Sequence, residues 1–66
     1  MKLTVNGDVR EAPTDATILT LLESLGLRPE IVAVEVNGEL VPRVTHGERR
    51  LAEGDRIEFV TLVGGG

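Results

Sequence analysis

Residues 56–63 read RIEFVTLV and are followed by three glycines, and this stretch decides how the rest of the chain is interpreted. The run predicts a strand over Arg56–Val63 that begins after a tight turn at Gly54-Asp55. Apolar residues fall on both of its faces, which is typical of a strand inside a sheet. Such a strand needs neighbours, and the preceding sequence supplies them.

The N-terminal residues predict one hairpin. Met1–Val5 alternates apolar and polar side chains, as in a half-buried strand. Asn6-Gly7 is the strongest short hairpin signal, because both residues tolerate positive φ. Val9–Ala12 is then the returning strand, and Pro13 ends it.

The middle of the chain predicts a second hairpin. Ile31–Val36 is a β-branched run that places Val32, Val34 and Val36 on one face. Asn37-Gly38 repeats the turn signal. Leu40 and Val41 begin a short strand, which Pro42 confines to an edge or ends.

One short helix is expected between the two hairpins. Its apolar stripe follows the i, i+3, i+4, i+7 spacing of a helix packed on one side. Thr17 is a plausible N-cap, although Asp15 or Thr14 would also serve. Gly26 supplies the left-handed residue of a Schellman cap, in which Leu27 folds back on Leu22. The stripe consists of Ile18, Leu21, Leu22 and Leu25.

The order hairpin, helix, hairpin, long strand predicts an α+β fold. One helix can cover only one face of a mixed sheet of four or five strands. The first and last strands would lie side by side in the middle and run parallel, and Val44–Ala52 would be an irregular connection. We therefore expect one domain over residues 1–63 and a flexible glycine tail over 64–66.

Composition narrows the classes of function. A chain of 66 residues has room for a thin core but not for a deep catalytic cavity as well. It has no cysteine, a net charge of −4, and one aromatic residue, so disulfides, thiolate metal sites and nucleic-acid binding are not expected. With no signal-peptide pattern and no apolar run of membrane-spanning length, we expect a cytoplasmic protein.

The glycine tail suggests a chemical role for the carboxyl end. Gly64, Gly65 and Gly66 could also be a frayed terminus or an engineered scar. They begin directly after Val63 without a polar spacer, and we expect them to end the chain. A carboxylate becomes a good acyl donor once ATP converts it to an acyl-adenylate. Glycines could carry this carboxylate through a narrow channel into the active site of a partner enzyme, because they have no side chain and accept any backbone angle.

A tail of this kind predicts a docking surface beside it. We expect Phe59, Val60, Leu62 and Val63 to contribute to that surface, with Val60 and Leu62 exposed in the free chain. The alternative is that a central strand is simply apolar on both sides.

The sequence offers little for catalysis by the chain itself. His46 is the only histidine, and we expect it to be solvated in a polar loop. The pairs Glu48/Arg49 and Glu53/Arg56 are expected to be surface charges. No phosphate-cradling loop or metal-ligand cluster is apparent, so a partner would bind ATP.

At this point the chain resembles a known family, the sulfur carriers of thiamin biosynthesis (ThiS family), which have the ubiquitin-like β-grasp fold. The resemblance covers essentially the whole chain, and its motifs are specific in this order and at this length. They are Asn6-Gly7, Thr17-Ile18 with Leu21-Leu22, Val34–Gly38, Val41–Arg43, Leu51 with Gly54-Asp55, and Val63–Gly66.

The resemblance implies a mechanism. An E1-like adenylyltransferase (ThiF) would adenylate Gly66 with ATP, and sulfur from a persulfide, made by a cysteine desulfurase or another donor, would displace AMP. The resulting thiocarboxylate would supply sulfur to thiazole synthase (ThiG). Gly64 and Gly65 would be the threading tail, and the chain would be a protein co-substrate rather than an enzyme, with no cofactor or metal of its own.

Two departures and two rival functions accompany the resemblance. The family often has an acidic residue where Thr20 stands, so we expect a weaker helix cap. It also often has an aromatic residue within the stretch Val44–Gly47, where this chain has none.

The small subunit of molybdopterin synthase (MoaD) is one rival. It shares the fold and the tail, but it tends to be longer and commonly has a Pro-Pro pair before its glycines. A ubiquitin-like protein modifier would share the activation step and differ in the acceptor.

Overall fold

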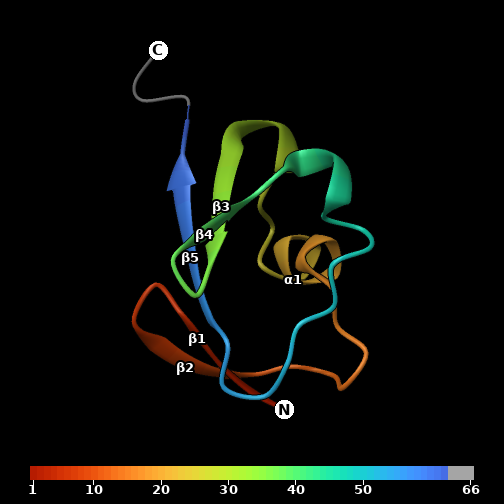
Figure 1. The fold of residues 1–66 in the computed structure, drawn as a ribbon, viewed down its shortest axis with the longest axis vertical. Coiled ribbons are helices and arrows are strands. Elements are labelled where there is room, and N and C mark those ends of the chain that lie inside the picture. Colours follow the sequence, from red (N-terminus) through yellow and green to blue (C-terminus); the bar gives the residue numbers. More distant parts are fainter. Residues whose placement is uncertain (63–66) are drawn as a thin grey trace.

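A computed structural model describes residues 1–62, and within that range five strands form one sheet with one α-helix across a face (Figure 1). The spatial order of the strands is β2-β1-β5-β3-β4. This confirms the predicted α+β, ubiquitin-like β-grasp architecture with a mixed sheet. The elements are β1 (Lys2–Val5), β2 (Asp8–Glu11), α1 (Ile18–Ser24), β3 (Val32–Val36), β4 (Glu39–Val41) and β5 (Arg56–Thr61), with two short 3-10 helices at Pro29–Ile31 and Arg43–Thr45.

Both hairpins turn at the predicted Asn-Gly pairs. Asn6 and Asn37 have φ of 48° and 53°, and Gly7 and Gly38 follow with φ of 88° and 86°. Two successive residues with positive φ form the turn whose twist matches the flanking strands. The antiparallel pairs β1–β2 and β3–β4 follow directly from this local chemistry.

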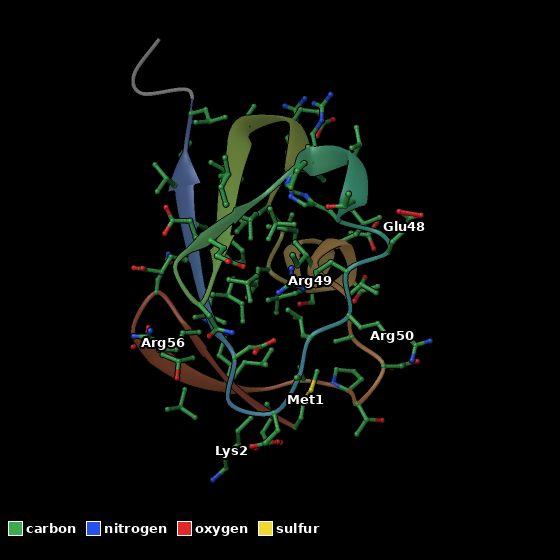
Figure 2. All side chains as sticks on the ribbon, in the orientation of Figure 1. Met1, Lys2, Glu48, Arg49, Arg50 and Arg56 are labelled. Atoms are coloured by element: carbon green, nitrogen blue, oxygen red, sulfur yellow. The ribbon has the colours of Figure 1, made fainter. Side chains whose placement is uncertain are left out.

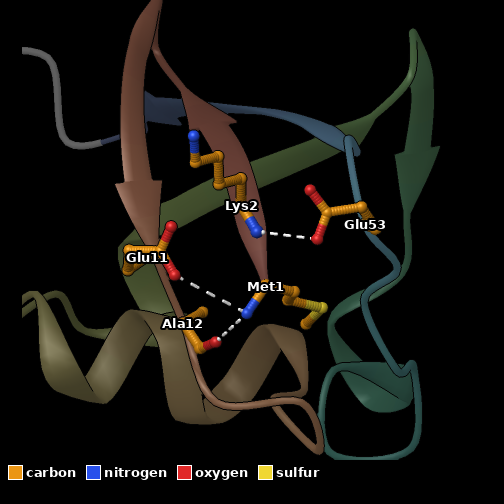
Figure 3. Close-up of polar contacts among 5 residues, drawn as sticks. All are labelled: Met1, Lys2, Glu11, Ala12 and Glu53. Atoms are coloured by element: carbon orange, nitrogen blue, oxygen red, sulfur yellow. Dashed lines mark hydrogen bonds and ion pairs between the residues drawn. The ribbon is translucent and has the colours of Figure 1, made fainter.

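The first and last strands lie side by side in the centre of the sheet and run parallel, as predicted. Thr4 is opposite Arg56, and Val5 is opposite Ile57. The start of β1 is also tied to its surroundings (Figure 3): the Met1 ammonium donates to the carbonyl of Ala12 at 2.7 Å and lies 3.8 Å from a Glu11 carboxylate oxygen. The backbone N–H of Lys2 donates to Glu53 Oε1 at 3.0 Å, so β1 is held against the turn that leads into β5.

The first turn of α1 has its backbone donors satisfied from two sources. Thr17 is the N-cap, and its hydroxyl accepts from the N–H of Thr20 at 3.2 Å. The N–H groups of Ile18 and Leu19 donate to the carbonyls of Arg49 and His46, at 3.1 and 3.0 Å. The connection after β4 therefore supplies acceptors that the helix itself lacks.

The expectation of a weakened cap at Thr20 is wrong. The Thr20 hydroxyl accepts from the N–H of Thr17 at 2.9 Å, so the capping box is complete in both directions. A hydroxyl at this position reaches the same backbone donor that a longer acidic side chain usually does.

The helix ends in the predicted Schellman motif. Gly26 has φ of 73°, the N–H of Leu27 donates to the Leu22 carbonyl at 2.9 Å, and the N–H of Gly26 donates to the Glu23 carbonyl at 3.1 Å. Leu25 is the C-cap rather than a helical residue, but it still packs against the core.

The core lies between α1 and one face of the sheet. Ile18, Leu21 and Leu22 of the helix meet the buried valines of β3, whose burial alternates as predicted. The connection after β4 contributes Leu51, which is buried despite the irregular backbone around it. β5 ends at Thr61, earlier than predicted, while Val63 and the predicted tail Gly64–Gly66 lie outside the described residues.

Candidate partner-docking surface

The two faces of β5 have different environments. Ile57 points into the core and has no exposed surface, and Phe59, which is opposite the buried Val34, is half-buried against the same cluster. Because side chains alternate along a strand, Glu58 and Val60 point to the opposite face, away from α1. That face has no helix over it in the described part of the chain.

A small apolar patch lies on this uncovered face at the end of β5. Val60 is 59% exposed and Leu62 is 63% exposed, as expected for both. Val60 is opposite Ala33 of β3, and Leu40 of β4 is 68% exposed on the same side of the sheet. We call these four residues, Ala33, Leu40, Val60 and Leu62, the β5 patch.

A hollow borders the patch where the last described residues leave the sheet. It has a volume of about 280 Å³, and Ala33, Leu40 and Leu62 line it together with Pro42 and Arg43. The patch is therefore not flat, and an apolar side chain from another protein could enter it.

Acidic side chains accompany the patch. Glu35 of β3 and Glu58 of β5 are directly opposite each other on the uncovered face. Like charges placed opposite each other in a sheet repel. Together with the net charge of −4, the pair favours a partner with basic residues around an apolar centre.

The structure places three of the four residues predicted for the docking surface. Val60 and Leu62 are on the uncovered face, whereas Phe59 faces the helix side and supports the core. Val63 and Gly64–Gly66 lie outside the described residues. The prediction missed Ala33 and Leu40, because their proximity to Val60 depends on the pairing of β3 with β4 and β5.

The expectation of a solvated His46 is wrong. Its side chain is 2% exposed, and Nε2 lies 3.2 Å from the Val41 carbonyl, while Nδ1 has no partner among the described residues. The 3-10 helix Arg43–Thr45 folds the loop back so that the ring packs beside β4. A histidine held in this way is a structural link between β4 and the connection that caps α1.

The other polar groups considered for catalysis have structural or solvated positions. Glu48 points away from the body (Figure 2), Arg49 is half-buried, Arg56 is exposed, and Glu53 accepts the Lys2 N–H. Asp55 shapes the turn before β5, since Oδ2 accepts from Ala52 N–H at 2.8 Å. Within residues 1–62 no group of three metal-ligating side chains occurs.

The single α-helix of the described range is too short to cross a bilayer. Nothing in that range therefore suggests a membrane-spanning helix.

Sequence comparison identifies the relatives of this chain. The profile of the ThiS family matches residues 3–66. The sulfur carrier protein ThiS of Bacillus subtilis is 42% identical over 65 residues, covering 97% of this chain and 98% of that protein. Two thiazole synthases, from Magnetococcus marinus and Paramagnetospirillum magneticum, are 46% and 39% identical over 66 residues, and the chain spans only 20% of their length.

Comparison with solved structures agrees. The crystal structure of the thiamine biosynthesis protein ThiS from Geobacter metallireducens superposes with a TM-score of 0.86 at 35% identity, and the match covers all of both chains. The likeness therefore extends over the sheet, the helix and both hairpins.

Proposed function

The chain belongs to the ThiS family, sulfur carriers of thiamin biosynthesis, and from this we propose that Gly66 is the residue that carries the sulfur, as a C-terminal thiocarboxylate. In this proposal Gly64 and Gly65 provide reach and access. The chain acts as a protein co-substrate and performs no catalysis itself.

The proposed chemistry has three steps. First, a carboxylate oxygen of Gly66 attacks the α-phosphorus of ATP, which forms an acyl-adenylate and releases pyrophosphate. Second, the terminal sulfur of a persulfide attacks the acyl carbon, and the bond to AMP breaks. A thiol of the partner then cleaves the S–S bond, forming a disulfide and leaving the thiocarboxylate on Gly66.

One observation supports this proposal above the others: two residues of the β5 patch, Val60 and Leu62, lie shortly before the glycines in the sequence. Val60 and Leu62 are more than half exposed on a face without a helix, at the end of the strand that leads to the tail. An apolar patch beside a reactive terminus is what a carrier needs if its body must dock before its end can react.

The energies involved show why docking matters. Ordering three glycines costs about 3–6 kcal/mol at 1–2 kcal/mol per residue. Burying the exposed parts of Val60 and Leu62 would contribute about 2–4 kcal/mol. The two side chains offset part of the ordering cost, and further contacts of the body have to supply the remainder.

The partners follow from the same proposal. ATP is bound by an E1-like adenylyltransferase (ThiF), because this chain presents no phosphate-binding loop among its described residues. The similarity of the chain to part of two thiazole synthases supports thiazole synthase (ThiG) as the sulfur acceptor. A cysteine desulfurase or another persulfide donor takes part indirectly.

Intact-mass measurement tests the proposal. The chain is incubated with ATP, an E1-like adenylyltransferase and a persulfide source, and the expected result is the mass increase of one sulfur replacing one oxygen. A variant with one alanine added after Gly66 should fold normally and remain unmodified. Conversion of the extended variant would refute the assignment of Gly66.

A second variant tests the role of glycine in the tail. Gly65→Trp should leave the unfolding midpoint unchanged, while pyrophosphate release by the adenylyltransferase falls sharply, because a bulky side chain blocks the channel. Conjugates to lysines in a cell extract would instead indicate a protein modifier. Sulfur transfer to a molybdopterin precursor, without transfer to thiazole synthase, would indicate the molybdopterin pathway.

A further inference from the structure

The two edges of β5 are paired to different extents. On one side, β3 pairs with β5 from Ile57 to Thr61. On the other side, β1 pairs with it only at Arg56 and Ile57, because the chain turns away at Asn6. Figure 1 shows the second half of β5 beside β3, with the β1–β2 hairpin reaching only its first half.

Hydrogen bonds show which backbone groups face the short side. The Ile57 carbonyl accepts from Asn6 N–H at 2.9 Å, and Phe59 N–H donates to Asn6 Oδ1 at 2.8 Å. On the long side, Leu62 N–H donates to the Ile31 carbonyl at 2.7 Å. Since backbone groups alternate between the two edges, the Phe59 carbonyl and the Thr61 N–H face the side that β1 has left. Neither group has a partner among residues 1–62.

This edge lacks the protection that the edge strand β2 has. β2 borders solvent with Asp8, Arg10 and Glu11, and charges of this kind discourage pairing with another strand. The segment Phe59–Thr61 has no charge and no proline. An unprotected edge that leads directly to the proposed reactive end is unusual unless something pairs with it.

Side-chain space is available on both faces of the edge. On the helix side, a hollow of about 250 Å³ has a mixed lining: the apolar residues are Val5, Leu25, Leu27 and Phe59, and the polar residues are Asn6, Asp8 and Arg10. On the other face is Val60 of the β5 patch. A strand added here would direct alternate side chains to these two places, which is how strand addition combines affinity with selectivity.

We propose that the edge Phe59–Thr61 accepts an extended strand of the adenylyltransferase, which pairs with the Phe59 carbonyl and the Thr61 N–H and brings a side chain to the hollow beside Leu27. The inference rests on the proposed function, since the occupant is the enzyme that activates Gly66. Strand addition would hold the last residues of the body extended and aim the tail. A second copy of the chain is a poorer occupant, because two chains of charge −4 repel.

Hydrogen exchange in the unaltered chain is the direct test. In the free protein the Thr61 amide should exchange fast and the Leu62 amide slowly. On addition of an adenylyltransferase that releases pyrophosphate with this chain, the Thr61 amide should become protected. Fast exchange of Thr61 in the functional complex would overturn the inference, and so would equal protection in a concentrated sample of the chain alone.

Two variants at one position provide a second test. Thr61→Pro removes the N–H that faces the open edge without removing a bond to β3, a site where a sheet tolerates proline. It should raise KM for the chain by about tenfold, because the variant loses one hydrogen bond to the partner strand and leaves the partner's acceptor unpaired. Thr61→Val alters the same side chain but keeps the N–H, and its KM should be unchanged.

The outcomes separate the two proposals. Equal KM values for Thr61→Pro, Thr61→Val and the unaltered chain would overturn strand addition and leave sulfur carriage in place. Absence of pyrophosphate release with the unaltered chain would overturn both.

Discussion

Glu35 and Glu58 provide a prediction in which stability and function change in opposite directions. The two carboxylates are directly opposite each other on the uncovered face of β3 and β5. Replacing Glu58 by lysine converts a repulsive cross-strand pair into an attractive one. We therefore expect Glu58→Lys to stabilise the fold.

The magnitude follows from the geometry of the pair. Two unit charges about 6 Å apart in water repel by about 0.7 kcal/mol, and reversing one sign changes the interaction by about twice that value before screening. Physiological salt, with a Debye length of about 8 Å, reduces the gain to about 0.7 kcal/mol. In a domain of this size, about 0.7 kcal/mol raises Tm by roughly 3–6 °C.

Thermal unfolding at low salt and at 1 M NaCl measures this gain. At 1 M salt the Debye length falls to about 3 Å, so most of the difference should disappear. Glu48→Lys is the matched control, because it changes the net charge equally at an exposed loop position. Reversing both members, with Glu35→Lys added, should remove the gain.

Two results would refute the reasoning. Glu58→Lys and Glu48→Lys could raise Tm equally, in which case the effect belongs to net charge and not to the pair. Alternatively, the gain could persist at 1 M salt, in which case it is not electrostatic. If the acidic pair serves a basic partner, Glu58→Lys should also slow adenylation, and Glu48→Lys should not.

Three further predictions concern the core, the β5 patch and the helix cap. Ile57→Ala removes a fully buried side chain and should cost about 2–5 kcal/mol in urea unfolding. The double variant Val60→Ser with Leu62→Ser should change stability by no more than about 0.5 kcal/mol while raising KM in the adenylation assay. Thr17→Ala should cost about 1 kcal/mol, and Thr20→Val should reproduce about half of that in thermal unfolding if its hydroxyl completes the capping box.

Local patterns predicted most of the architecture. The two Asn-Gly pairs set both hairpins because their turns need positive φ at two successive residues, and the structure has it at both places. Gly26 and Leu27 predicted the end of α1 for a similar reason. In each case the cause and the structure lie within a few residues of each other.

Predictions that depended on distant neighbours were less successful. His46 was expected in solvent, but the turn at Arg43–Thr45 buries it beside β4. Phe59 was assigned to the docking surface with Val60, and only the pairing of β5 with β3 shows that the two side chains point to opposite faces of the sheet. The error at Thr20 has a local cause instead: Thr20 was expected to weaken a cap that it completes, because hydroxyl and carboxylate reach the same donor.

By itself, then, the sequence determined the strands, the helix, both hairpin turns, and the glycines that are proposed to react. Only the tertiary structure decided which side of β5 is free, because that depends on where β1 stops. Asn6 meets the N–H of Phe59 across 53 residues of chain, and beyond that contact the edge has no neighbour among the described residues. Side-chain periodicity reports which face a residue occupies, but it carries no information about which backbone groups of a strand remain unpaired.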